Sequence, residues 1–122
     1  MAHILIADDE REAREIIRKI LERAGHGVTE ASGGEEALRI LRGGEVDLCI
    51  LDILMPDKDG LEVIREVRKR MPDLRILAIS GGGRQGSALY LSVAEKTGMA
   101  KALPKPFSAE RLLSVVQELL EG

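Results

Sequence analysis

The chain contains the run LCILDILMPDKDG at residues 48–60. Four apolar residues, Leu48–Leu51, lead directly to Asp52 and then to a loop that contains Pro56 and Gly60. An apolar run without polar alternation is typical of a strand buried on both faces, as in a parallel sheet that is covered by helices. The run therefore predicts an α/β fold with a carboxylate at the end of a middle strand.

Short apolar runs and longer amphipathic stretches alternate along the rest of the chain. Further strands are predicted at Ile4–Ala7, Gly27–Glu30, Ile76–Ile79 and Ala102–Leu103. Five β-then-α units with right-handed crossovers predict one doubly wound parallel sheet. The helices are indicated by apolar residues at helical spacing: Ala13, Ile16, Ile17, Ile20, Leu21 and Ala24; Leu61, Ile64, Val67 and Met71; Leu112, Leu113, Val116, Leu119 and Leu120; and, less regularly, residues within Glu35–Leu41 and Ala88–Thr97.

Several residues mark the ends of these helices. Ser108 is expected to be the N-cap of the last helix, and Gly25 and Gly43-Gly44 are expected to end earlier ones. The faces rich in arginine and glutamate are expected to be solvated surface. Pro106 is a candidate for a cis peptide bond.

Composition narrows the function. The 122 residues suit one domain, and a net charge of −3 argues against a nucleic-acid surface. No apolar run has membrane-span length, and the start lacks a signal-peptide pattern. The one cysteine, Cys49, excludes an intramolecular disulfide and is expected to be a small buried hydrophobe. A cytoplasmic protein without membrane or nucleic-acid partners is expected.

Polar residues follow four of the predicted strands at or just after their ends: Asp8-Asp9, Asp52, Ser80 and Lys105. In doubly wound sheets the ligand site lies at the carboxyl ends of the strands. We therefore expect one pocket that contains three carboxylates, a hydroxyl and an ammonium group.

Three close carboxylates repel one another, and a divalent cation removes this repulsion. Hard oxygen ligands favour Mg²⁺, with Mn²⁺ as an alternative, whereas the single cysteine and two dispersed histidines do not suggest zinc. With Mg²⁺ and Lys105 present, the formal charges of Asp8, Asp9 and Asp52 are balanced.

An aspartate can attack phosphorus and form an acyl phosphate, which requires neutralisation of the phosphoryl oxygens. Asp52 is the candidate nucleophile, and Lys105 and Ser80 are candidates to hold those oxygens. Each candidate has a plainer alternative: Asp52 as a turn or helix cap, Asp8-Asp9 as a cap of the first helix, Ser80 as part of a turn, and Lys105 as a surface side chain.

Four segments closely resemble the receiver domain of two-component response regulators: ADDE at residues 7–10, LDILMPDKDG at 51–60, ISG at 79–81 and LPKPF at 103–107. The resemblance covers essentially the whole chain. It implies a flavodoxin-like (βα)5 sandwich of sheet order 2-1-3-4-5. It also implies that residues 1–122 form a single stand-alone receiver similar to chemotaxis regulators, a monomer or weak dimer.

The resemblance also assigns roles to residues. Asp52 would accept a phosphoryl group from a phosphohistidine on a sensor kinase or phosphotransfer protein. Asp9 would bind Mg²⁺ directly, Asp8 mainly through water, and the Leu54 backbone carbonyl would be a further ligand. Ser80 and Lys105 would hold the phosphoryl oxygens. A downstream partner would bind the face formed by the fourth helix, the fifth strand and the fifth helix.

One position departs from the family pattern. The family usually has an aromatic residue three positions before the lysine, where this chain has Ala102. We therefore hypothesise that switching relies on the Gly81–Gly86 loop and the following helix, with Tyr90 as a reporter or partner contact. A pseudo-receiver that binds partners without phosphorylation is the alternative.

Two other classes fit the residues less well. A phosphatase of the haloacid dehalogenase type needs an acid at Leu54. A flavodoxin-type cofactor domain would not place acidic residues where a flavin phosphate binds.

Overall fold

This computed structural model describes residues 2–53, 55, 60–81 and 100–121. Five parallel strands form one sheet of order β2-β1-β3-β4-β5, and the predicted fold class is confirmed. The strands are β1 (His3–Ala7), β2 (Gly27–Ala31), β3 (Leu48–Asp52), β4 (Arg75–Gly81) and β5 (Ala100–Lys105). The described helices are α1 (Arg11–Arg23), α2 (Gly34–Leu41), α3 (Gly60–Arg70) and α5 (Ala109–Glu121).

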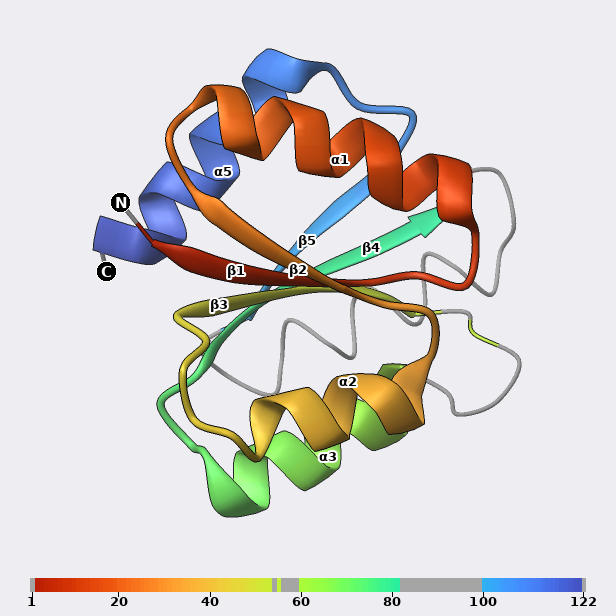
Figure 1. Cartoon of the computed structure of the whole chain (residues 1–122), viewed down its shortest axis with the longest axis vertical. Coiled ribbons are helices and arrows are strands. Elements are labelled where there is room, and N and C mark those ends of the chain that lie inside the picture. Colours follow the sequence, from red (N-terminus) through yellow and green to blue (C-terminus); the bar gives the residue numbers. More distant parts are fainter. Residues whose placement is uncertain (1, 54, 56–59, 82–99, 122) are drawn as a thin grey trace.

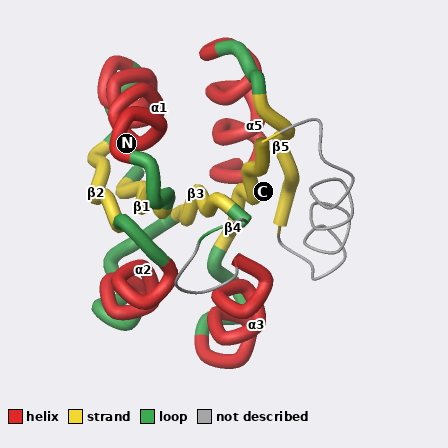
Figure 2. Tube along the Cα trace, turned by 90° about the vertical axis from the view of Figure 1, so that its right-hand side faces the viewer, coloured by secondary structure: helices red, strands yellow, loops and turns green. Residues whose placement is uncertain are grey.

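The helices form a layer on each side of the sheet. Helices α1 and α5 cover one face, and α2 and α3 cover the other (Figure 1). The view turned by 90° about the vertical axis also shows the sheet between these two layers of helices (Figure 2). The predicted helix at Ala88–Thr97 lies outside the described residues.

Successive residues of the inner strands point to different layers, as the period of a strand requires. In β1, Leu5 and Ala7 belong to the core on the α2–α3 side, whereas Ile4 and Ile6 belong to the core on the α1–α5 side. Because both faces are buried, the central positions of the inner strands must be apolar. This is the physical reason for the unbroken apolar runs in the sequence.

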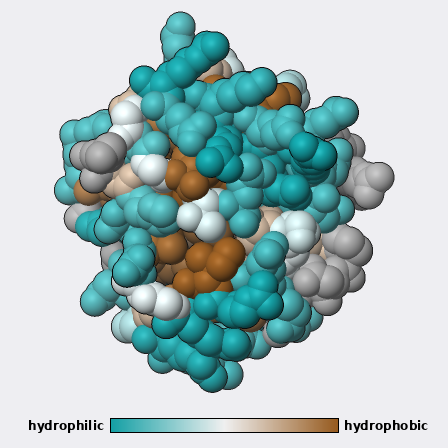
Figure 3. Space-filling view, viewed as in Figure 1, coloured by the Kyte–Doolittle hydropathy of each residue, from teal (hydrophilic) through white to brown (hydrophobic). Residues whose placement is uncertain are grey.

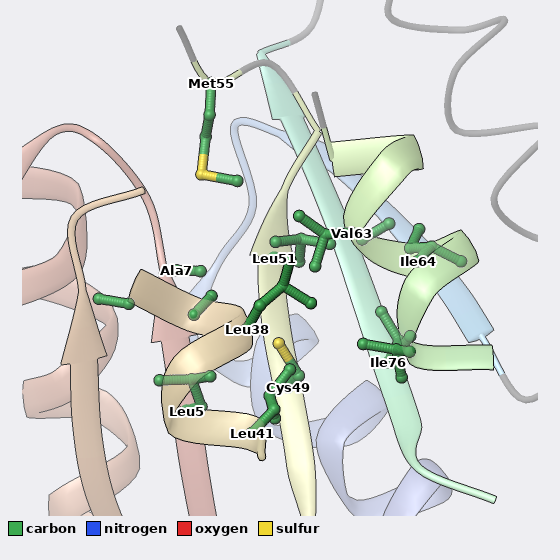
Figure 4. Close-up of a cluster of buried hydrophobic side chains, with 14 of the residues drawn as sticks. Leu5, Ala7, Leu38, Leu41, Cys49, Leu51, Met55, Val63, Ile64 and Ile76 are labelled. Atoms are coloured by element: carbon green, nitrogen blue, oxygen red, sulfur yellow. The ribbon is translucent and has the colours of Figure 1, made fainter. Parts of the chain in front are cut away.

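Cys49 lies in the core between β3 and the α2–α3 layer (Figure 4). Its thiol is free and buried, as predicted. Burial in apolar surroundings raises the pKa of the Cys49 thiol to about 12. The thiol is therefore protonated at neutral pH and acts as a packing group.

The ends of the helices are formed by the predicted residues. The Oγ atom of Ser108 accepts a hydrogen bond of 3.0 Å from the Arg111 amide, which confirms the cap of α5. Gly25 and Gly44 follow α1 and α2 with φ values of 94° and 77°, a conformation that favours glycine. The Lys105–Pro106 peptide bond is cis, as suggested by the sequence.

Two predictions about the elements need correction. Strand β5 spans six residues instead of the predicted two, because Pro104 and the charged residues beside it obscure its pattern. An edge strand tolerates such residues. Ile16 was placed in the apolar stripe of α1 but is 60% exposed, because only the centre of that stripe faces the sheet.

The molecular surface in the orientation of Figure 1 is mostly hydrophilic, with hydrophobic residues gathered near the middle of the view (Figure 3). Within the described ranges, no helix combines the length and apolar character that a membrane span requires.

Candidate functional site

The strand register places two of the predicted acidic residues side by side. Ala7 of β1 pairs with Leu51 of β3, so Asp8 and Asp52, each the next residue along, are neighbours at the carboxyl edge of the sheet. Asp8 comes two residues after Ile6, and Asp52 comes two residues after Ile50. By the alternation of strands, both side chains are on the α1–α5 side of the sheet.

Lys105 also lies at this carboxyl edge, at the end of β5, which is two strands from β3 in the sheet. It ends β5 two residues after Leu103, which packs on the α1–α5 side. Its Nζ atom lies 3.4 Å from Asp8 Oδ2 and 3.9 Å from Asp52 Oδ2. The lysine side chain is 26% exposed, so its ammonium group contacts both carboxylates at a partly open site.

Asp9 completes a group of three carboxylates. Asp8, Asp9 and Asp52 each offer an oxygen atom, and these atoms all lie within 4.8 Å of one another. Asp8 and Asp52 are buried, whereas Asp9 is exposed. Carboxylate oxygens at this spacing, open to water on one side, fit a hard divalent cation such as Mg²⁺, which retains several waters.

Asp8 is held in place by contacts on several sides. Its Oδ1 atom accepts a 2.8 Å hydrogen bond from the Glu10 amide, and its own amide donates to the Ala31 carbonyl of β2 at 3.1 Å. Glu10 is the N-cap residue of α1, and its side chain makes no capping hydrogen bond. Asp8 thus accepts a hydrogen bond at the entry to α1 and also belongs to the acidic group.

The remaining predicted site residues are only partly described. Ser80 is in β4, where it pairs with Pro104 of β5, but its side chain is outside the described set. The Leu54 carbonyl, the loop from residue 82 to 86 and Tyr90 also lie outside the described residues. Ala102 pairs with Ala78 in the middle of β5 and is partly buried.

One residue beside the site was missed by the sequence analysis. The charged face of α1 was expected to be solvated, but the Arg14 side chain is only 14% exposed. Its Nη1 atom donates a 2.7 Å hydrogen bond to the Asp8 carbonyl, and its Nε atom donates to Glu30 Oε1 at 2.9 Å. A glutamate inside predicted strand β2 was the available signal, because a partly buried carboxylate requires a cationic partner.

An apolar groove adjoins the site. Its volume is about 400 Å³, and it lies between α1 and the residues that follow β5. The lining residues are Ala13, Ile16, Ile17, Lys105, Pro106 and Phe107. Lys105 therefore lines the groove and also contacts Asp8 and Asp52, and the exposed Ile16 lines the groove as well.

Curated proteins that are similar to this chain include signalling proteins of several architectures. A sensor kinase, CckA of Brucella abortus, is 39% identical over 98% of this chain. The transcriptional regulator NtrC of Azospirillum brasilense and the response regulator MprA of Mycolicibacterium vanbaalenii are each 38% identical, over 99% and 96% of it. The chain spans 13%, 24% and 49% of the lengths of these three relatives.

Solved structures agree along almost the entire chain. A response regulator receiver domain protein from Clostridium thermocellum superimposes with a TM-score of 0.92 at 30% identity, covering 99% of this chain and 95% of that one. The response regulator TrrA of Thermotoga maritima, solved in complex with Mg²⁺ and BeF, gives 0.85 at 35% identity, covering 98% and 100%.

The family model described as "Response regulator receiver domain" matches residues 4–117. These residues include all five strands, apart from His3 at the start of β1, and all three acidic residues of the site. The chain therefore belongs to the response regulator receiver domain family, whose members are signalling switches of two-component phosphorelays.

Proposed function

We propose that residues 1–122 act as one receiver unit in which Asp52 is phosphorylated with the help of Mg²⁺. One observation carries the proposal: oxygen atoms of three carboxylates lie within 4.8 Å of one another. The Nζ atom of Lys105 lies 3.9 Å from Oδ2 of Asp52, one of the three. A structural ion pair requires one carboxylate for one lysine. The excess of negative charge, at an edge open to water, is what a metal-assisted phosphoryl acceptor needs.

The phosphoryl donor is a phosphohistidine of a sensor kinase or phosphotransfer protein. An Asp52 carboxylate oxygen forms the new P–O bond as the P–N bond breaks. The electron pair of that bond stays on the imidazole nitrogen, which takes a proton from water. Asp8, Asp9 and Asp52 would hold Mg²⁺, which would supply charge neutralisation for the phosphoryl oxygens.

Lys105 has a different role before and after the transfer. Before it, the ammonium group pairs with Asp8 and Asp52 and limits their repulsion. Afterwards, one phosphoryl oxygen replaces the lost carboxylate charge as its partner. We assign Ser80 and the Leu54 carbonyl as a further phosphoryl contact and a further metal ligand, on the strength of the family motif.

The groove beside Lys105 suits the surface of the donor. A histidine can reach Asp52 only if the protein that carries it covers this edge of the sheet. Lys105 lines this groove together with the apolar side chains of Ile16 and Phe107. A helix of the donor protein would bury this apolar surface. The downstream partner is assigned to the face that includes β5 and α5, and the location is the cytoplasm.

Intact mass after incubation with a small acyl-phosphate donor, with and without Mg²⁺, tests the proposal. We expect one added phosphoryl group that requires Mg²⁺ and is absent from Asp52→Asn. Asp73→Asn, in the exposed connection between α3 and β4 at the other end of the sheet, is the matched control and should be labelled normally.

The same experiment addresses the pseudo-receiver alternative, which Ala102 favours because the usual aromatic side chain is missing. A folded protein that binds Mg²⁺ and gains no phosphoryl group, from the small donor or from a kinase, would support a module that binds partners without phosphorylation. Labelling of Asp52→Asn at the normal level would overturn the assignment of the acceptor.

A further inference from the structure

Arg14 connects three parts of the chain beside the acidic site. From α1, its guanidinium donates to the Asp8 carbonyl in the β1–α1 connection and to Glu30 in β2. Glu30 also accepts a 2.8 Å hydrogen bond from Arg18 Nη1, one turn further along α1. Arg14 and Arg18 of α1 thus both donate hydrogen bonds to Glu30, and Arg14 also donates to the backbone carbonyl of Asp8.

The contacted carbonyl belongs to the peptide that joins Asp8 to Asp9. Rotation of this peptide would move the Asp9 carboxylate relative to Asp52. Asp8 has side-chain contacts of its own, to the Glu10 amide and to Lys105. For the exposed Asp9, the residues that the structure describes provide no side-chain hydrogen bond or ion pair, so its position depends on the backbone that precedes it.

We propose that Arg14 is a positioning residue for metal binding: by holding the Asp8–Asp9 peptide, it keeps the Asp9 carboxylate within reach of the ion held by Asp8 and Asp52. The inference rests on the proposed function. Arg14 acts through the backbone and touches neither the metal ligands' carboxylates nor the phosphoryl group. Groups that orient metal ligands from outside commonly affect metal affinity about tenfold or more.

Two substitutions on the same helix separate positioning from stability. Arg14→Met keeps the length of the apolar stem and removes both hydrogen bonds. Arg18→Met is the matched control, because it also removes a contact to Glu30 but leaves the Asp8 carbonyl bound. Arg14→Lys keeps the charge and can donate to only one of the two acceptors at the original geometry.

Mg²⁺ affinity is measured by calorimetric titration, and Mn²⁺ affinity by the spin-resonance signal of the free ion. The free energy of unfolding in EDTA is measured in parallel. We expect Arg14→Met to weaken binding of both ions about tenfold and Arg18→Met to change it less than about twofold, with comparable losses of stability. Arg14→Lys should lie between Arg14→Met and wild type. Phosphorylation of Arg14→Met should need more Mg²⁺ but reach the wild-type rate at saturation.

Equal Mg²⁺ affinity in Arg14→Met and wild type, or equal loss in Arg14→Met and Arg18→Met, would overturn the role of Arg14 while leaving the proposed function in place. If Arg14→Met does not fold, Arg14→Lys decides by the same comparison with Arg18→Met. A folded wild-type protein that binds neither ion would overturn the metal site and this inference together.

Discussion

At the scale of single residues, Gly60 shows how a missing side chain shapes the loop after Asp52. A Cβ atom at Gly60 would lie 2.6 Å from Ile53 Cα and 2.9 Å from the carbonyl oxygens of Asp52 and Ile53. The Gly60 amide also donates a 2.8 Å hydrogen bond to the Ile53 carbonyl. The start of α3 therefore packs directly against the backbone of Asp52 and Ile53.

Gly60→Ala should lower the free energy of unfolding by about 1–3 kcal/mol, because backbone atoms and not a flexible side chain must move. Urea denaturation measures the change. Gly27→Ala is the control, since its Cβ atom would approach a movable group, His3 Nδ1, at 3.3 Å. Equal losses in the two variants would contradict the close packing at Gly60.

At the scale of elements, the strands were predicted most accurately where burial on both faces requires apolar residues. Strands β1, β3 and β4 are buried on both faces, so their composition alone reveals them. Edge strand β5 faces weaker constraints and was predicted too short. The meeting of Asp8, Asp52 and Lys105 was predictable because parallel strands end at one edge. The contact between Arg14 and the Asp8 carbonyl was not, because a charged residue on an amphipathic helix is usually solvated.

The ion cluster between α1 and β2 makes stability depend on pH. Hydrogen bonds from Arg18, and then from Arg14, lower the pKa of Glu30 against the opposing effect of its partial burial. The unfolded chain therefore binds a proton at Glu30 at a higher pH than the folded protein does. The stabilisation is complete above the unfolded pKa of about 4.3 and is lost as pH falls through the lower folded pKa.

Glu30→Gln should thus be less stable than wild type by a constant amount above about pH 5, and the difference should shrink below about pH 4. Urea denaturation at a series of pH values measures both proteins. In an Arg18→Met background the pH dependence of this difference should weaken, because the leading hydrogen bond to Glu30 is gone. A difference that grows as pH falls would contradict the lowered pKa of Glu30.

At the scale of the whole molecule, folding brings like charges together at the carboxyl edge of the sheet, two of them on buried side chains. The two cores bury apolar residues from all five strands. At the carboxyl edge of the sheet, three carboxylates lie within 4.8 Å of one another, and one described lysine contacts them. A folded chain without a cation must hold these like charges together, whereas the unfolded chain separates them. We therefore expect the site to lower the stability of the metal-free protein, and a bound divalent ion would offset that cost.

Asp52→Asn should consequently be more stable than wild type in EDTA, by about 1 kcal/mol, the value of a close charge pair in a water-like medium. Excess Mg²⁺ should stabilise wild type more than the variant, so the gap should narrow or reverse. Urea denaturation in both conditions measures this. Asp73→Asn, remote from the cluster, keeps all three carboxylates, so its stability should differ from that of wild type by the same amount in EDTA and in Mg²⁺. Lower stability of Asp52→Asn in EDTA would mean that the ion pair with Lys105 outweighs the repulsion, and the need for a cation at this edge would lose its physical basis.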